Sequence, residues 1–190
     1  MAEVEMAEVE IASGKRHRNR CASFIKDKRG ATAVEFALVA GPFLGLIAAI
    51  VQTFLVFFAQ ELLESVVQLS GRQILTGQVQ SQQLTQAAFQ QTVCSQVVIL
   101  FNCNGLMVDV QVPTALSSAN TSTPTLTYNG SGQVSNTWQF NPGNAGDPVV
   151  VRVMYLWPIF LGRFGFCPSV QANGTCLIMA TAAFQNEPSS

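Results

Sequence analysis

Residues 28–42 read Lys28-Arg-Gly-Ala-Thr-Ala-Val-Glu35-Phe-Ala-Leu-Val-Ala-Gly-Pro42, and the sequence then stays apolar as far as Ala59. Glu35 is the only charged residue between Arg29 and Glu61. A carboxylate in a membrane-spanning helix costs roughly 2.5–3.5 kcal/mol at the helix centre and less near its end. Glu35 is therefore a candidate functional residue, and the question is which group it pairs with.

The apolar segment at residues 36–59 is interrupted only by Gln52 and Thr53. At a rise of about 1.5 Å per residue it is long enough to cross a hydrocarbon core of about 30 Å. It is too long for the apolar part of a secretory signal, and no small-residue cleavage site follows it. We therefore expect one transmembrane helix. The alternative, a buried helix of a soluble protein, is disfavoured by the length and the uniform hydrophobicity.

Charge is distributed unevenly along the 190 residues, of which 48% are apolar and only 11% charged. Seven of the ten Lys and Arg residues precede Gly30. Basic residues beside an apolar segment stay on the cytoplasmic side of a membrane. We expect a cytoplasmic N-terminus and an exported C-terminal part. Nucleic-acid binding is the competing interpretation of the basic cluster, and we set it aside because no basic domain follows.

Three segments are expected along the chain. Residues 1–30 form a basic leader. Residues 31–77 form the membrane helix and its amphipathic continuation, with a kink at Gly41-Pro42 and a stop at Gly77. Residues 78–190 form an exported α+β domain.

The exported part shows alternating patterns that are typical of strands, with one further helical pattern. Strands joined without helices between them favour an antiparallel sheet, which we expect to pack on the helix. A second, shorter helix is expected within residues 81–101, although 97–101 also fit a strand. The expected strands are 106–112, 133–140, 149–157 and 177–184, with a long loop at 113–133.

Cysteines suggest an oxidising compartment for the exported part. Cys21 lies in the leader, and the other four form two pairs, each nine residues apart. Four cysteines allow three connectivities, and we favour nearest-neighbour disulfides. The spacing is too wide for a typical structural zinc site, so we expect no metal and no cofactor. The favoured disulfides are Cys94–Cys103 and Cys167–Cys176.

Residues after Gly30 offer little for catalysis, because they include no histidine and no lysine; His17 lies in the leader. We therefore expect a protein that is not an enzyme. Two alternatives stay open: an exported binding module on an uncleaved anchor, and a disulfide-stabilised envelope enzyme. Three aromatic residues are candidates for a binding surface or, more often in proteins, for sheet core: Trp138, Tyr155 and Trp157.

The stretch Arg29-Gly-Ala-Thr-Ala-Val-Glu-Phe-Ala-Leu-Val39 resembles the leader junction of type IV pilin-like proteins. More narrowly, it resembles TadE-like pseudopilins of tight-adherence (Flp-type) pilus systems. The segments Phe140–Tyr155 and Thr181–Pro188 also resemble this family.

The resemblance implies a pilin-like protein of the bacterial inner membrane that serves pilus assembly, secretion and cell adhesion. A prepilin peptidase would cut between Gly30 and Ala31. Glu35 would then pair with the new ammonium group of Ala31, in the same or a neighbouring subunit, or else stay solvated at the membrane interface. Other partners would be pseudopilins, pilin subunits and the assembly platform. The sizeable exported domain points to a minor component.

Overall fold

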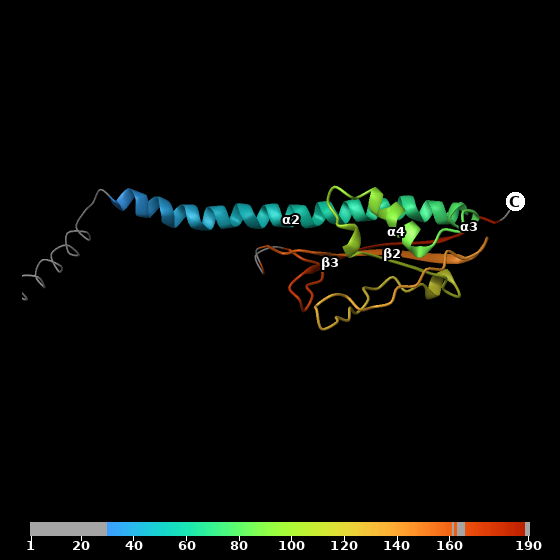
Figure 1. Cartoon of the computed structure of the whole chain (residues 1–190). Coiled ribbons are helices and arrows are strands. Elements are labelled where there is room, and N and C mark those ends of the chain that lie inside the picture. The colour runs from blue at the N-terminus through green and yellow to red at the C-terminus, as the bar shows by residue number, and fades with distance from the viewer. Residues whose placement is uncertain (1–29, 161, 163–165, 189–190) are drawn as a thin grey trace, which may run out of the picture. The chain divides into compact units, whose positions relative to one another are not determined.

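The computed structural model describes residues 30–160, 162 and 166–188 (Figure 1). The chain divides into two compact units, Met1–Ile47 and Ala48–Ser190. The leader's expected features, Cys21 among them, lie outside the described residues. The division into leader, helix and exported domain stays a prediction.

One long helix, α2, runs from Ala31 to Leu75 and includes Pro42. The expected kink at Pro42 stays a prediction. The expected stop is confirmed: Gly77 has a φ of 73°, and its N–H donates to the carbonyl of Ile74 at 2.9 Å. A left-handed residue that closes a helix is usually glycine, because it has no Cβ to clash.

Within the second unit, one face of α2 is buried. Its buried residues recur mostly at spacings of three and four, which places them on a single stripe of the helix. Charged residues Glu61, Glu64 and Arg72 lie on the exposed face. The stripe therefore docks α2 onto the rest of the unit. It consists of Gln52, Val56, Ala59, Leu63, Val66, Val67, Ser70 and Ile74.

Two short helices follow, α3 (Gln78–Ser81) and α4 (Gln86–Ser95). The Thr85 hydroxyl caps α4 by accepting the N–H of Ala88 at 3.3 Å. The expected helix at 81–101 is thus shorter, and residues 96–100 form turns, not a strand. Val97 of this turn segment is buried, whereas Val98 and Ile99 are exposed, so the hydrophobic pattern of the segment does not mark a regular element.

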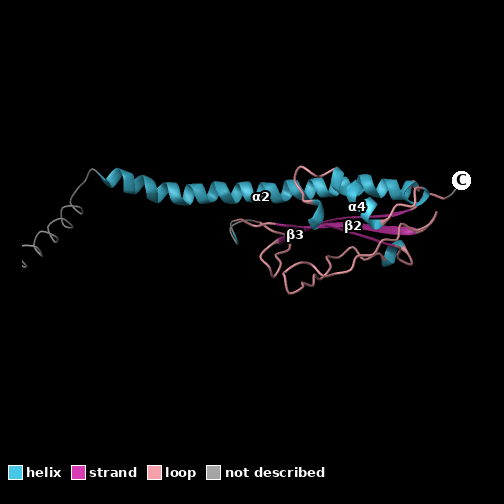
Figure 2. Cartoon of the chain, in the orientation of Figure 1, coloured by secondary structure: helices cyan, strands magenta, loops and turns pink. Residues whose placement is uncertain are grey.

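The three strands form one antiparallel sheet in the order β1-β2-β3 (Figure 2). The α+β class and three of the four expected strands are confirmed. Trp157 lies opposite Cys176 at one end of the sheet, and Pro148 lies opposite Gln185 at the other. The strands are β1 (Leu106–Gln111), β2 (Pro148–Trp157) and β3 (Cys176–Gln185).

The expected strand at 133–140 is wrong. This segment makes only isolated bridges, at Val134 and at Phe140, the second of which pairs with Val110 of β1. The backbone N–H of Gln139 donates to the Asp109 carboxylate at 2.8 Å instead of to a neighbouring strand. Its backbone pairing with β1 is limited to Val110, whose N–H donates to the Gln139 carbonyl and whose carbonyl accepts the N–H of Asn141, so the expected ladder does not extend along the segment.

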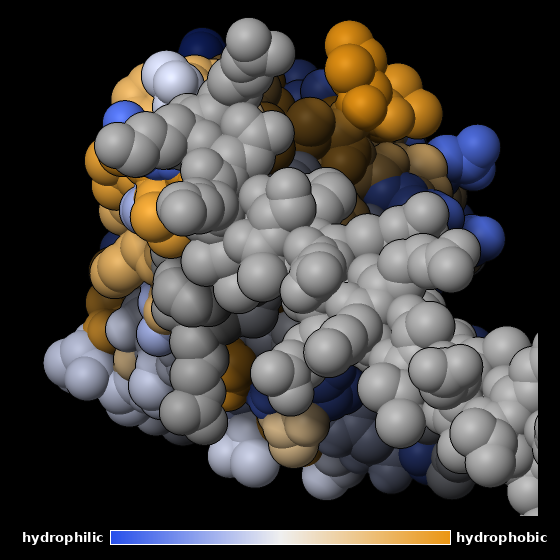
Figure 3. Space-filling view, turned by 90° about the vertical axis from the view of Figure 1, so that its left-hand side faces the viewer, coloured by the Kyte–Doolittle hydropathy of each residue, from blue (hydrophilic) through white to orange (hydrophobic). Residues whose placement is uncertain are grey.

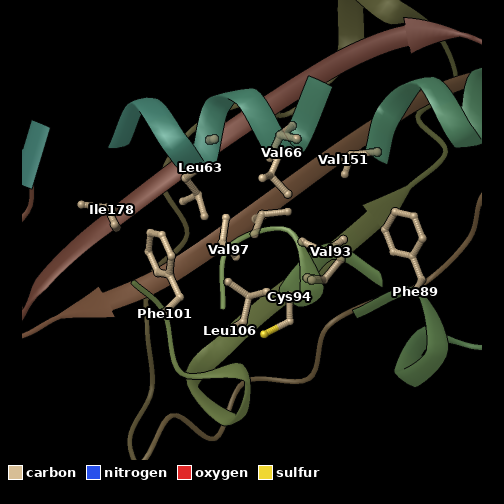
Figure 4. Packing of buried hydrophobic residues seen from close by; sticks show 14 of the residues in the cluster. Leu63, Val66, Phe89, Val93, Cys94, Val97, Phe101, Leu106, Val151 and Ile178 are labelled. Atoms are coloured by element: carbon tan, nitrogen blue, oxygen red, sulfur yellow. The ribbon is translucent and has the colours of Figure 1, made fainter. Parts of the chain in front are cut away.

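The sheet is covered on both faces. Alternate strand residues face the main core, which they share with α2, α4 and the 96–101 turns. Figure 4 shows Leu63 and Val66 of α2 close to Val93 and Val97 in this core. The other strand residues face a smaller cluster under the loop that precedes β2, with Leu126 and Trp138. This second cover explains why Met107, Met154 and Leu177, which face away from the main core, are apolar.

A buried ion pair lies on the loop-covered face. Asp109 of β1 stands directly opposite Arg152 of β2, and the two residues are 1% and 6% exposed. Arg152 donates from Nε to Asp109 Oδ2 at 3.0 Å and from Nη2 to the same oxygen. Because Asp109 also accepts from Gln139, the pair fixes the covering loop to the sheet.

We predict that Asp109→Ala strongly destabilises the α+β domain. Removing one partner of a buried pair costs about 3–5 kcal/mol, which lowers the unfolding midpoint by roughly 10 °C. Thermal unfolding of the full chain in detergent, followed by circular dichroism, measures the shift. Glu61→Ala is the matched control, because Glu61 is exposed. Equal midpoints in the two variants would contradict the role given to the pair.

Candidate leader junction and membrane helix

The predicted cleavage point coincides with the start of α2. The helix begins at Ala31, and Gly30 before it is exposed. A Cβ at Gly30 would meet nothing within 4 Å. The fold itself therefore places no steric demand for glycine at this position. A binding partner that contacts Gly30 is then the source of any requirement for glycine at this position.

Glu35 lies one helical turn after Ala31 and is exposed. Within the described part of the chain it makes no ion pair, since the pair found there joins Asp109 and Arg152. Its neighbours along the helix are apolar and exposed. A single copy of the described chain thus leaves this carboxylate without a counter-charge.

The N-terminal part of α2 is apolar around its whole circumference. An 18-residue stretch of the helix has a mean hydropathy of 2.2, and none of it is buried. By length and composition this helix can cross a membrane, whereas the core helix of a soluble protein would be largely covered. The exposed residues include Val34, Phe36, Leu38, Val39, Phe43, Leu44, Leu46, Ile47, Ile50 and Val51.

Gly41 and Gly45 stand one turn apart on this exposed part of the helix. A Cβ at either glycine would meet nothing within 4 Å. Small residues at this spacing let two membrane helices approach closely. The structure keeps both positions accessible.

Both cysteine pairs adopt the nearest-neighbour arrangement. The Cα atoms are 5.5 Å apart for Cys94 and Cys103, and 5.7 Å apart for Cys167 and Cys176. The first pair joins the end of α4 to the approach to β1, and the second joins the start of β3 to the preceding loop. The disulfides thus brace the same end of the sheet at two places.

The structure places the three aromatic candidates in different environments. Trp157 is buried in the main core, where its ring packs against Phe101. Trp138 and Tyr155 are half-buried and line an open groove of about 500 Å³ together with Asn104 and Gln133. The core interpretation is confirmed for Trp157, while Tyr155 and Trp138 pack as half-buried residues against the main and the smaller core cluster.

Sequence reasoning missed the pairing of Asp109 with Arg152, because 43 positions separate the two residues. The available signal was that each is the only charge in an otherwise apolar strand. Asp147, the other isolated acid, accepts the backbone N–H of Asn144 at 2.8 Å and shapes the turn before β2. Among the described residues, no group of three or more His, Cys, Asp or Glu is placed to hold a metal.

The site is thus an apolar, uncovered helix with one carboxylate near its start, joined to a disulfide-braced α+β domain. The family model for TadE-like proteins matches residues 30–72, which confirms the TadE-like resemblance for this segment. The matched segment contains Gly30, Glu35 and the whole exposed apolar surface. No curated protein and no solved structure matches the chain.

We predict that charges at the middle of the apolar surface weaken membrane retention. In the double variant Leu46→Arg/Ile50→Arg, each arginine adds roughly 2.5–3.5 kcal/mol to the free energy of inserting the helix into the membrane. The measurement is the fraction of full-length protein that stays in the membrane pellet after alkaline extraction. Leu69→Arg is the control, because Leu69 is exposed on the same helix beyond the apolar segment. Identical retention of both variants would argue against a membrane span.

Proposed function

We propose that this protein is a minor, pseudopilin-like component in the assembly of a tight-adherence pilus. The observation that carries the proposal is the TadE-like match over residues 30–72, on a helix whose apolar surface is uncovered and whose only charge before Glu61 is Glu35. The protein acts by packing its helix against other helices in the membrane and has no catalytic role.

The proposed location is the bacterial inner membrane. The basic leader stays in the cytoplasm, since seven of ten basic residues precede Gly30. The helix spans the bilayer once, and the domain with the two disulfides faces the periplasm or the exterior, where disulfides persist. The TadE-like match and the candidate span support this placement.

In this proposal a prepilin peptidase removes the leader by cutting after Gly30. Glycine suits a narrow peptidase pocket, and the exposure of Gly30 leaves it accessible. The cut creates an ammonium group on Ala31, one turn from Glu35 along α2. The exposed carboxylate then has a counter-charge that the uncut chain lacks at this position.

Pairing between neighbouring subunits gives the charge pair its function. Two opposite charges in an apolar layer offset each other's desolvation when they are in contact, and an unpaired charge does not gain this compensation. The ammonium of one subunit facing Glu35 of the next therefore selects one axial register between packed helices. Gly41 and Gly45 permit the close approach that this contact needs.

The exported domain suggests a minor place in the filament system. It has its own hydrophobic core and a sheet braced by two disulfides. A minimal filament subunit would not need a domain of this size. The proposed partners are other pseudopilins, pilin subunits, the peptidase and the assembly platform.

A second candidate is an uncleaved, single-pass envelope protein with an exported adhesin-like binding module. The observation that favours it is the groove beside Trp138 and Tyr155, where aromatic faces and the amides of Asn104 and Gln133 meet. Such a lining suits small polar ligands.

We predict that Glu35→Ala abolishes pilus assembly, because the variant loses the contact that fixes the register of the helices. The measurement is the number of pili per cell by electron microscopy in a strain whose only copy of the protein carries the change. Glu61→Ala is the matched control, since Glu61 is an exposed glutamate of the same helix outside the apolar segment.

Both variants should accumulate in the membrane with intact disulfides, which non-reducing electrophoresis checks. Normal piliation of the Glu35→Ala strain would refute the charge-pairing mechanism. Loss of pili in both variants would show that the effect is not specific to Glu35.

A further inference from the structure

The open groove of about 500 Å³ lies beside the start of β1, and its volume is within the range of small-ligand sites, about 300–1,000 Å³. Its lining residues are all described, and none of them is charged. The groove lies towards the end of the sheet where Trp157 pairs with Cys176. Figure 3 views this end, and hydrophilic and hydrophobic residues lie side by side where uncertain residues do not cover them.

Three hydrogen-bonding groups of the lining are unused within the described part of the chain. Neither the side-chain amide of Asn104 nor the indole N–H of Trp138 bonds to another described residue. The Gln133 side chain accepts one long bond, from Asn129 Nδ2 at 3.5 Å, and its own amide N–H groups are unused there. Because Asn104 and Gln133 are exposed, the groove can donate hydrogen bonds to a neutral polar ligand and accept them from it.

The Tyr155 ring of the groove is held in one orientation. It packs edge-on against Phe101, with centroids 4.9 Å apart and planes at 89°. Its hydroxyl accepts the backbone N–H of Asn102 at 3.4 Å. Gly105 lets the backbone pass close to the ring, since a Cβ at this position would lie 3.1 Å from Tyr155 Cε2. A ligand that packs on this ring therefore has little ordering to do.

The turns that carry the two amides are fixed as well. Asn104 follows the disulfide-bonded Cys103, and its backbone N–H donates to the Asn102 side chain at 3.0 Å. The backbone N–H of Gln133 donates to the Asn129 side chain at 2.9 Å. The polar groups of the groove are thus supported by a second set of contacts, as binding sites with defined geometry require.

A peptide added as a strand is disfavoured, because the edge of β1 beside the groove is already in use. Gln90 Nε2 donates to the Leu106 carbonyl at 2.6 Å, and Gln86 Nε2 donates to the Val108 carbonyl at 3.3 Å. Strand addition needs main-chain hydrogen bonds along such an edge, and these two acceptors are taken.

We propose that the groove binds a neutral oligosaccharide. A sugar ring has apolar C–H faces that pack on aromatic rings and hydroxyl groups that exchange hydrogen bonds with amides. The groove supplies both kinds of partner, from Trp138 and Tyr155 and from Asn104 and Gln133. An anionic ligand would find no cationic side chain in the lining. This inference rests on the groove named for the second candidate function, and it holds whether or not the leader is cut.

The test is binding of the full chain to an array of neutral and acidic oligosaccharides, in a detergent without a sugar head group. We expect retention of neutral glycans, and isothermal titration calorimetry then measures the affinity for the best of them. Asn104→Ala and Gln133→Ala should each weaken it about three- to tenfold, which is the effect of losing one hydrogen bond. Gln78→Ala is the matched control and should leave the affinity unchanged, because Gln78 is an exposed glutamine outside the groove.

Retention of no neutral glycan would overturn this inference, and so would retention of acidic glycans alone. Equal affinity of the unmodified protein and both groove variants would also overturn it, because the sugar would then bind elsewhere. Failure of the proposed functions is measured separately: piliation of the Glu35→Ala strain tests the pilus role, and the mature N-terminus tests the uncleaved anchor.

Discussion

The structure depends on a change in what surrounds helix α2. Up to Val51 the large apolar side chains of α2 are exposed, and from Gln52 onward one stripe is buried in the α+β domain. A helix that is apolar all round needs a non-aqueous environment, whereas a one-sided stripe needs a folded partner. The same 45-residue helix has both surfaces, so a segment that can cross a membrane and a segment that packs on a folded domain belong to one element.

The α+β domain packs on the C-terminal half of α2. Alternate residues of the three strands meet α2 and α4, and the opposite face of the sheet is closed by a loop that Asp109 and Arg152 fix in place. The two cysteine pairs brace the end of the sheet near Trp157.

Much of this fold follows from local patterns in the sequence. The helix, its stop at Gly77 and the strands around Val108, Val151 and Ile178 are visible because hydrophobic periodicity and glycine conformation are local properties. The failures are non-local. The segment 133–140 alternates like a strand, yet Asp109, distant in sequence, takes the N–H of Gln139. At the candidate site, the sequence singles out Glu35 by its isolation, but it gives no sign that Phe166 stacks on Phe57.

The central claim is that a cut after Gly30 frees an amine that pairs with Glu35. N-terminal sequencing of the protein extracted from membranes of piliated cells tests it most directly. The account predicts Ala31 as the first residue of the accumulated product. A product that begins upstream of Gly30 would contradict it, because no ammonium group would then exist at Ala31, and the protein would be a tethered exported domain.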